Sequence, residues 1–452
     1  MTTAPTKLYS AERKLSHDWL ILAITFVLMI VTPAAMLAAG ALLVIQFAER
    51  IPAEWMQVLF AEGSWLRWLV PAVLVLAIAL GIISPLMVWV ERRILSLMQS
   101  RLGPNRVGPF GLFQPLADTL KLISKEDIIP DNASKFIFKL APCLVLFPAL
   151  AGWVVVPMGP IFQAAGSRFD IFQMSDLTVG ILYVFAISSL GVLGVVLGGW
   201  ASGSKYPLLG SLRSTNQMLS YEVPLGLSVL GVLMMTGSLQ FNAIVGYQQN
   251  HEYHLFGLHL PLWNIFLQFP AFLIFLVAGI AETNRVPFDL AEAEAELTAG
   301  FHTEYSGFRF AAFFMAEYLN MWLMSCMGTL LFLGGWLIPQ QNHVVAWLGL
   351  EQHPMVLAAL QALMFILKAF SFMFVFVWIR STIPRYRYDQ LMNLGWKLLI
   401  PLALWNLVWT AFAVKFGFLV GIPVAIVTFI PLYRFLDRHA TNPHTRAVAV
   451  PS

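Results

Sequence analysis

Long apolar runs recur along this chain, separated by short stretches that hold nearly all of its charge. The sequence is 59% hydrophobic and 11% charged. A run of about 20 apolar residues can cross a bilayer as a helix, and backbone polar groups inside lipid need a helix's internal hydrogen bonds. We therefore expect an all-α polytopic membrane protein with about ten transmembrane helices. The expected spans are residues 20–48, 66–98, 135–157, 177–199, 217–236, 265–283, 309–338, 357–380, 396–414 and 417–434.

Lysine and arginine are distributed unevenly between the two sides that these spans define. An even number of spans places both ends on one side, and that side collects 22 of the 27 basic residues. The other side has four, and Lys368 falls within a span. Cytoplasmic loops of membrane proteins carry the excess of basic residues. Both termini are therefore expected to be cytoplasmic. The net charge of +3 mostly reflects this asymmetry, so no nucleic-acid partner is expected.

Few residues in the chain are suited to holding a cofactor or a metal ion. Cys143 and Cys326, its two cysteines, lie in separate predicted spans, whereas an iron–sulfur cluster or a structural zinc site needs several ligands. His251, His254 and His259 share an outer loop without a specific ligand pattern. No nucleotide-binding glycine motif is present. We expect no bound cofactor and no metal in this chain.

One short stretch between two predicted spans holds a quarter of the acidic residues. It reads AETNRVPFDLAEAEAELTAGFHTEY, with Arg285 near its start. Crowded carboxylates repel each other, so some are expected to stay protonated or to recruit cations or a partner. A solvated acidic loop is the alternative, although interspersed apolar residues argue against full solvation. The basic-aromatic segment IRSTIPRYRYDQLM is a candidate to balance these charges. The six carboxylates belong to Glu282, Asp289, Glu292, Glu294, Glu296 and Glu304.

A short amphipathic helix is expected after the second span, in GPNRVGPFGLFQPLADTLKL. Gly-Pro pairs at 103–104 and 108–109 end the preceding helix. Apolar residues then recur at helical spacing from Leu112 to Ile123, opposite Gln114 and Asp118. Such a helix lies in the plane of the membrane surface. It is either a connector anchored to lipid headgroups or the frame of a lateral opening for a lipid-soluble molecule.

Several ionisable residues fall inside predicted spans, where charge is costly and tends to mark ion pathways. Glu317 and Lys368 are expected deep in the seventh and eighth spans, and a structural ion pair between them is one reading. The other reading is proton exchange, because burial disfavours the charged form of both groups. Glu91, Glu222 and Glu282 add further depths on the same half of the bilayer. For Glu222, a boundary glutamate that reaches water is the alternative.

Four small residues in the fourth span, Gly191, Gly194, Gly198 and Gly199, are expected to allow close packing of neighbouring helices.

Four long segments, in order, resemble one known family. They are GPNRVGPFGLFQPLADTLKL, GSKYPLLGSLRSTNQMLSYEVPLGL, AETNRVPFDLAEAEAELTAGFHTEYSGFRFAAFFMAEY and IRSTIPRYRYDQLM. These closely resemble the quinone-site membrane subunit of proton-pumping NADH:quinone oxidoreductase, respiratory complex I. The likeness covers residues 66–414, an eight-helix core. Residues 1–65 and 415–452 would each add one helix and a cytoplasmic tail. Ala291 stands where the family commonly has proline.

The resemblance implies a role for this chain. Quinone would be the substrate, entering beside the amphipathic helix, while flavin and iron–sulfur clusters would belong to partner subunits. The partners would be peripheral subunits with the terminal iron–sulfur cluster and the quinone headgroup site, small and antiporter-like membrane subunits, and membrane lipids. The location would be a bacterial cytoplasmic (inner) membrane. The quinone chamber and its entrance would use Glu91, Arg92, Arg101, Asp289, Glu292, Glu294, Glu296 and Glu304. The proton path would use Asp118, Tyr221, Glu222, Glu282, Glu317 and Lys368.

Three other functions remain open at this stage. A subunit of a membrane-bound hydrogenase or ferredoxin-linked complex would share the fold and the charged path. A stand-alone secondary transporter predicts internal repeats, and none is found in the sequence. A purely structural anchor for peripheral proteins would tolerate the loss of Glu317.

Overall fold

The computed structural model describes residues 84–160, 173–250, 263–289, 299–338 and 354–417, with the backbone of four short strands and a few single positions besides. The predicted span 20–48 falls outside the described residues, as do most of the span 417–434 and most of the first half of the span 66–98. The predicted terminal segments 1–65 and 415–452 are likewise untested, apart from the last residues of α17.

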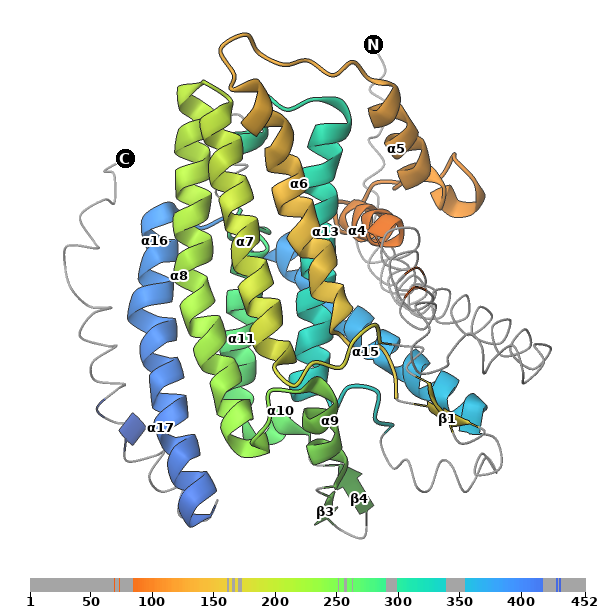
Figure 1. Cartoon of the computed structure of the whole chain (residues 1–452), viewed down its shortest axis with the longest axis vertical. Helices are drawn as coiled ribbons and strands as arrows, with labels where there is room; N and C mark the ends of the chain where they lie inside the picture. The colour runs from red at the N-terminus through yellow and green to blue at the C-terminus, as the bar shows by residue number, and fades with distance from the viewer. Residues whose placement is uncertain are drawn as a thin grey trace, which may run out of the picture.

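The described residues form a helical bundle, which agrees with the predicted fold class (Figure 1). Five segments in them are long and apolar enough to cross a membrane: Lys135–Val154, Gly180–Ala201, Lys205–Thr236, Leu357–Thr382 and Tyr388–Phe416. The helical elements are α4 (Ser84–Met98), η2 (Pro109–Gly111), α5 (Gln114–Ser124), α6 (Lys135–Ala151), η3 (Gly152–Val154), α7 (Gly180–Ala201), α8 (Lys205–Thr236), α9 (Phe241–Asn250), α10 (Asn264–Leu267), α11 (Phe269–Glu282), η4 (Gly300–His302), α13 (Gly307–Phe332), α15 (Pro354–Thr382), α16 (Tyr388–Asn393), η6 (Leu394–Leu399) and α17 (Ile400–Phe416).

Helix α13 lies at the centre of the bundle. It contacts α4 and α15 on one side and α6 and α11 on the other. Nearly all of its side chains from Ala312 to Phe332 are buried. A helix that is surrounded by protein need not be uniformly apolar, because neighbouring helices rather than lipid meet its polar side chains. This explains how α13 carries Glu317, Asn320 and Ser325 within the membrane region.

The predicted amphipathic helix is confirmed as α5, outside the main bundle and beside α4 (Figure 1). Pro115 occupies its first turn, where a missing N–H costs no hydrogen bond. Its apolar side chains Leu116, Leu120 and Ile123 are all more than half exposed. An apolar face that the bundle leaves uncovered suits the membrane interface.

Helix α8 begins at Lys205, earlier than the predicted span of 217–236. The extra turns carry Ser211, Ser214 and Thr215, which are buried against other helices. Because these residues are polar, hydropathy does not predict this part of the helix. The helix ends at Gly237, which adopts the left-handed conformation typical of a helix terminus.

The last described segment differs in a similar way from the predicted span 396–414. It begins with α16 at Tyr388 and passes through the π-helical turn η6 before α17. Buried hydrogen bonds fasten it to α11. Asn406 Nδ2 donates to Gln268 Oε1 at 2.8 Å, and Gln268 Nε2 donates to Thr410 Oγ1 at 2.9 Å. Polar pairs of this kind hold helices together where lipid offers no competing partner.

Two of the connections contain short antiparallel hairpins that the sequence analysis did not anticipate. In each hairpin, two neighbouring strands pair antiparallel. The strands are β1 (Phe162–Ala164) with β2 (Ser167–Phe169), and β3 (Glu252–Leu255) with β4 (Leu258–Pro261).

Candidate functional site

Two carboxylates and two guanidinium groups meet inside the bundle, and each comes from a different element. Glu91 of α4 is buried and pairs with Arg380 of α15. Arg285, which follows α11, lies 3.4 Å from Glu91 and 3.8 Å from the carboxylate of Glu317 on α13. Its guanidinium also sits 4.1 Å from the ring centre of Tyr318. Buried charges are tolerated when they are paired in this way.

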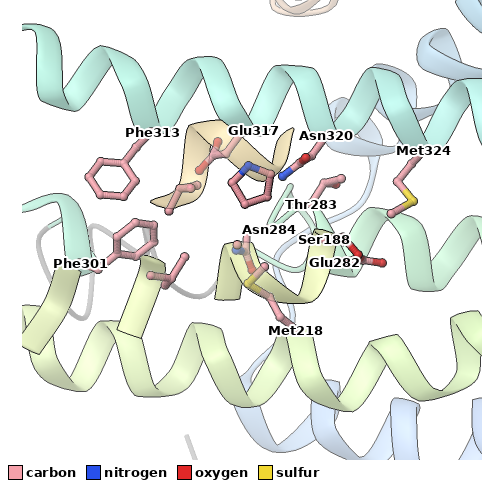
Figure 2. A pocket seen from close by; sticks show the side chains of 14 residues that line it. Ser188, Met218, Glu282, Thr283, Asn284, Phe301, Phe313, Glu317, Asn320 and Met324 are labelled. Atoms are coloured by element: carbon pink, nitrogen blue, oxygen red, sulfur yellow. The ribbon is translucent and has the colours of Figure 1, made fainter. Parts of the chain in front are cut away.

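A cavity of about 40 Å³ adjoins this cluster. Figure 2 shows Glu317 and Asn320 projecting from α13 toward Thr283 and Asn284, which follow α11. Glu282 Oε2 and Asn284 Oδ1 are buried and accept no hydrogen bond from the residues that the structure describes. A buried water needs roughly 10–15 Å³ of such space and two to four polar partners. The cavity therefore suits about two or three water molecules between Glu317 and Glu282.

A second group of polar side chains continues from the cavity to helices α7 and α8. Ser188, which lines the cavity, hydrogen-bonds the carboxylate of Glu282. The next residue, Ser189, donates to Glu222 of α8. Glu222 is half-buried. Arg285 thus lies between Glu91 and Glu317, the cavity lies between Glu317 and Glu282, and neighbouring serines contact Glu282 and Glu222.

The start of the acidic stretch is held by the basic-aromatic loop that precedes α16. Asp289 is buried, with Arg385 at 3.5 Å. Phe288 stacks on Tyr386 with ring centres 5.6 Å apart, and its other neighbour is Tyr221 at 5.9 Å. The Tyr221 hydroxyl donates to the carbonyl of Leu391 at 2.9 Å. The expected charge balance between the two loops is confirmed for the pair of Asp289 and Arg385.

Two of the residues expected at the entrance, Arg92 and Arg101, lie on or near α4 and α5, on the outside of the bundle. Arg92 pairs with Asp118, which also accepts a hydrogen bond from Gln114 at 3.1 Å. Arg101 is exposed and donates to the side chain of Gln99. Asp118 was predicted to belong to the proton path, but its described ion pair is with Arg92, at the surface.

Lys368 lies apart from these carboxylates, at the other end of α13. Its ammonium group donates to the carbonyls of Leu333 at 2.8 Å, Gly335 at 3.0 Å and Leu337 at 2.7 Å. The ring centre of Trp263 is 4.3 Å away. Lys368 therefore binds carbonyls of the segment that directly follows the end of α13.

His302 and Tyr305 lie next to the cavity, between η4 and α13. Burial among Phe301, Phe313 and Phe314 lowers the pKa of His302 to about 3, so its imidazole is neutral near pH 7. Burial also raises the pKa of the Tyr305 phenol above its ordinary value, although Arg309 opposes the shift. The Tyr305 hydroxyl donates to the carbonyl of Gly198 at 3.3 Å.

The structure describes only some of the remaining candidate site residues. Glu304 is half-buried in the loop before α13. Glu292, Glu294 and Glu296 lie outside the described residues. The site contains two residues that the sequence analysis counted only as basic loop residues, Arg285 and Arg380. A signal for them was present, because each stands at the membrane end of an apolar helix within one of the quoted motifs.

Comparisons with known proteins agree on one family. The family model described as NADH dehydrogenase matches residues 70–411. The chain is 49% identical over 332 residues to the H subunit of the NADH-quinone oxidoreductase of Thermomicrobium roseum, covering 74% of this chain and 91% of the relative. It is 47% identical to the corresponding protein of Protochlamydia amoebophila, covering 72% and 91%. For that of Rhodospirillum centenum, the identity is 44% and the coverage 78% and 98%.

Proposed function

The chain belongs to the NADH dehydrogenase family, and we propose that it is the membrane subunit of an NADH-quinone oxidoreductase that couples quinone reduction to proton translocation. Its relatives are named as the H subunit of NADH-quinone oxidoreductase, which favours this function over the hydrogenase-linked alternative. The chain contributes to an enzyme complex without a redox centre of its own, since two cysteines cannot ligate an iron–sulfur cluster.

Quinone is the proposed substrate, and the region around α4 and α5 is the proposed entrance to its chamber. The exposed apolar face of α5 would rest in the membrane interface beside the opening. Arg92 and Arg101 would lie at the rim, with Glu91 inside. Asp289 and Glu304 would border the chamber, together with the acidic residues between them. Flavin and iron–sulfur clusters are assigned to peripheral partner subunits.

The proposed proton path runs from Glu91 through Glu317 and Glu282 to Glu222. The observation that carries it is the small cavity with two unsatisfied buried acceptors, Glu282 Oε2 and Asn284 Oδ1. Water in that cavity would bridge Glu317 and Glu282, which both line it. Ser188 and Ser189 would complete the connection to Glu222.

Coupling would be electrostatic. Delivering electrons and protons to quinone changes the charge beside Glu91 and Asp289. Charges about 4 Å apart interact by roughly 4 kcal/mol at an effective dielectric constant near 20, which is enough to move a proton between neighbouring groups. A change in the protonation of Glu91 would then alter the protonation of Glu317 and of the carboxylates beyond it. Glu222, at the half-buried end of the path, would transfer the proton to a neighbouring antiporter-like membrane subunit.

We place the assembled complex in the bacterial cytoplasmic membrane, with both ends of this chain on the cytoplasmic side. The uneven distribution of basic residues supports this orientation. Purification in mild detergent tests the partners. Recovery of flavin-containing, iron–sulfur and antiporter-like subunits is expected, and recovery of a hydrogenase in their place would contradict the assignment.

Replacing the path carboxylates in the assembled complex tests the path. Glu317→Gln and Glu282→Gln are expected to lower the protons translocated per NADH oxidised by roughly tenfold or more, because an amide cannot carry the proton. Glu126→Gln changes an exposed carboxylate and serves as the matched control. Everted membrane vesicles report both quinone reduction and acidification, and NADH oxidation by ferricyanide reports assembly. Unchanged translocation in both path variants would refute the path.

A further inference from the structure

Arg285 occupies an unusual position between two carboxylates of the proposed path. Its Nη1 lies 3.4 and 3.5 Å from the two oxygens of Glu91, and its Nη2 lies 3.8 Å from Glu317 Oε2. The first two distances are at the outer limit of a hydrogen bond, and the third exceeds it. The Arg285 side chain is only 7% exposed. A shift of about 1 Å or less would therefore tighten either pair at the expense of the other.

A second arginine, Arg380, makes the attraction of Arg285 to its two carboxylates unequal. Arg380 also pairs with Glu91, so Glu91 is held by two guanidinium groups. Arg285, in turn, is shared by two carboxylates. When Glu91 is ionised, it attracts both arginines. When Glu91 is neutral, Coulomb attraction favours Glu317 as the partner of Arg285, since charges this deeply buried are weakly screened.

The surroundings allow that shift without unfolding. The guanidinium lies over the face of Tyr318, with 4.1 Å between its central carbon and the ring centre. An aromatic face attracts a cation but does not fix its position within the plane as a hydrogen bond would. Tyr318 is the residue next to Glu317 on α13, so the ring provides a surface along which Arg285 can approach that carboxylate.

We propose that Arg285 is a positioning residue that alternates between Glu91 and Glu317 and makes their protonation states opposite. A proton that reaches the carboxylate of Glu91 neutralises it and frees Arg285. Arg285 then pairs with Glu317, whose O–H bond breaks as its proton passes to water in the cavity and on toward Glu282. The total charge of the cluster is the same before and after, because one carboxylate gains the proton that the other loses. This inference rests on the proposed function.

Infrared difference spectroscopy of the assembled complex tests the alternation. A carboxyl group that gains a proton on quinone reduction gives a positive band, and one that loses a proton gives a negative band. The wild type is expected to show a positive band that disappears in Glu91→Gln and a negative band that disappears in Glu317→Gln. Arg285→Gln is expected to keep the first band and lose the second. Proton translocation per NADH should fall about tenfold, a typical size for coupling between two sites.

The matched control is Arg380→Gln, which removes the other arginine of Glu91 and leaves Arg285 between the carboxylates. Both bands are expected to remain in it. NADH oxidation by ferricyanide confirms assembly in every variant. If Arg285→Gln does not assemble, Tyr318→Leu keeps the charge but removes the aromatic face, and the negative band is expected to weaken.

The outcomes separate this inference from the proposed function. A negative band from Glu317 that persists in Arg285→Gln, or at full strength in Tyr318→Leu when Arg285→Gln fails to assemble, would overturn the alternation while leaving the path in place. A wild-type complex in which neither Glu91 nor Glu317 changes protonation would overturn both. Rescue of the negative band in Arg285→Lys relative to Arg285→Gln would further support a role for the charge itself.

Discussion

His302 illustrates how burial sets what a single residue can do in this site. The imidazole lies among phenylalanine rings beside the cavity, and burial lowers its pKa to about 3. It therefore stays neutral near pH 7. In the proposed path, carboxylates and water would carry the proton, and His302 contributes packing.

The lowered pKa of His302 predicts that the stability of the folded chain depends on pH. The unfolded chain binds a proton at His302 near pH 6.5, whereas the folded chain resists it down to about pH 3. The stability that neutral His302 contributes is therefore fully present above pH 6.5. As the pH falls below that value, the free energy of unfolding decreases by up to roughly 1.4 kcal/mol per pH unit. His302→Phe is expected to make the thermal midpoint of the complex less sensitive to acid between pH 7 and pH 5. Equal sensitivity in the variant and the wild type would contradict this explanation, and a comparison at pH 8 controls for packing.

Among the elements, helices α6 and α7 pack closely because of particular glycines. A Cβ atom added at Gly194 would lie 2.9 Å from the backbone nitrogen of Val145. One added at Gly199 would lie 2.6 Å from the carbonyl oxygen of Pro207, at the start of α8. At Gly191, the nearest atom would be Pro148 Cβ at 4.0 Å. The prediction of close packing is confirmed for Gly194 and Gly199.

These distances predict opposite results for similar substitutions. Gly194→Ala is expected to destabilise the complex by about 1–3 kcal/mol, since backbone cannot yield as a flexible side chain can. Gly191→Ala has space and gains helix propensity, so it is expected to be neutral or slightly stabilising. Thermal unfolding of the solubilised complex compares the two. Similar losses in both variants would show that local helix flexibility, and not contact with α6, explains the glycines.

The far end of α13 is joined to three other elements through its unpaired carbonyls. Gln248 of α9 donates to Leu330 O, and Asn264 of α10 donates to Leu331 O. Lys368 of α15 donates hydrogen bonds to the carbonyls of Leu333, Gly335 and Leu337, which follow the helix. A cation at a helix C-terminus also opposes the negative end of the helix dipole. Lys368 thus has a sufficient structural role.

Lys368→Met tests that role against the proton path in which the sequence analysis placed it. Loss of charge-assisted hydrogen bonds is expected to cost about 3 kcal/mol locally and to speed amide hydrogen exchange in residues 333–337. Lys397→Met, at an exposed position, is the control. Translocation per NADH should stay near wild type in both variants. A loss of translocation without faster exchange would favour the path.

The elements that could be predicted are those that a pattern within a short stretch of sequence defines. The spacing of apolar residues in α5 and the hydropathy of α6, α7 and α15 were sufficient. The start of α8 was missed because Ser211, Ser214 and Thr215 are polar residues that other helices cover. The role of Arg285 was missed because Glu91 lies 194 positions away in the sequence. Lys368 shows the same limit, since its partners are backbone carbonyls, which no side-chain pattern reveals.

On the scale of the whole molecule, the linked carboxylates run across the bundle. Glu91 belongs to α4 on one flank, and Glu222 belongs to α8 on the opposite flank (Figure 1). Glu317 and the cavity lie between them, against the central helix α13. The arrangement therefore connects two sides of the bundle. The proposed path would therefore need a neighbouring membrane subunit to complete the crossing of the bilayer.

The chain alone is therefore expected not to conduct protons. Reconstituted by itself into lipid vesicles with a pH gradient, it should dissipate that gradient no faster than its Glu317→Gln variant. A stand-alone transporter predicts the reverse, because its site would open alternately to both sides of the membrane. Dissipation that requires Glu317 would show that the path reaches both surfaces within this one chain. Equal, slow dissipation in both preparations, with translocation regained on assembly with the partner subunits, would place the crossing in a neighbouring subunit and leave this chain the lateral connection to it.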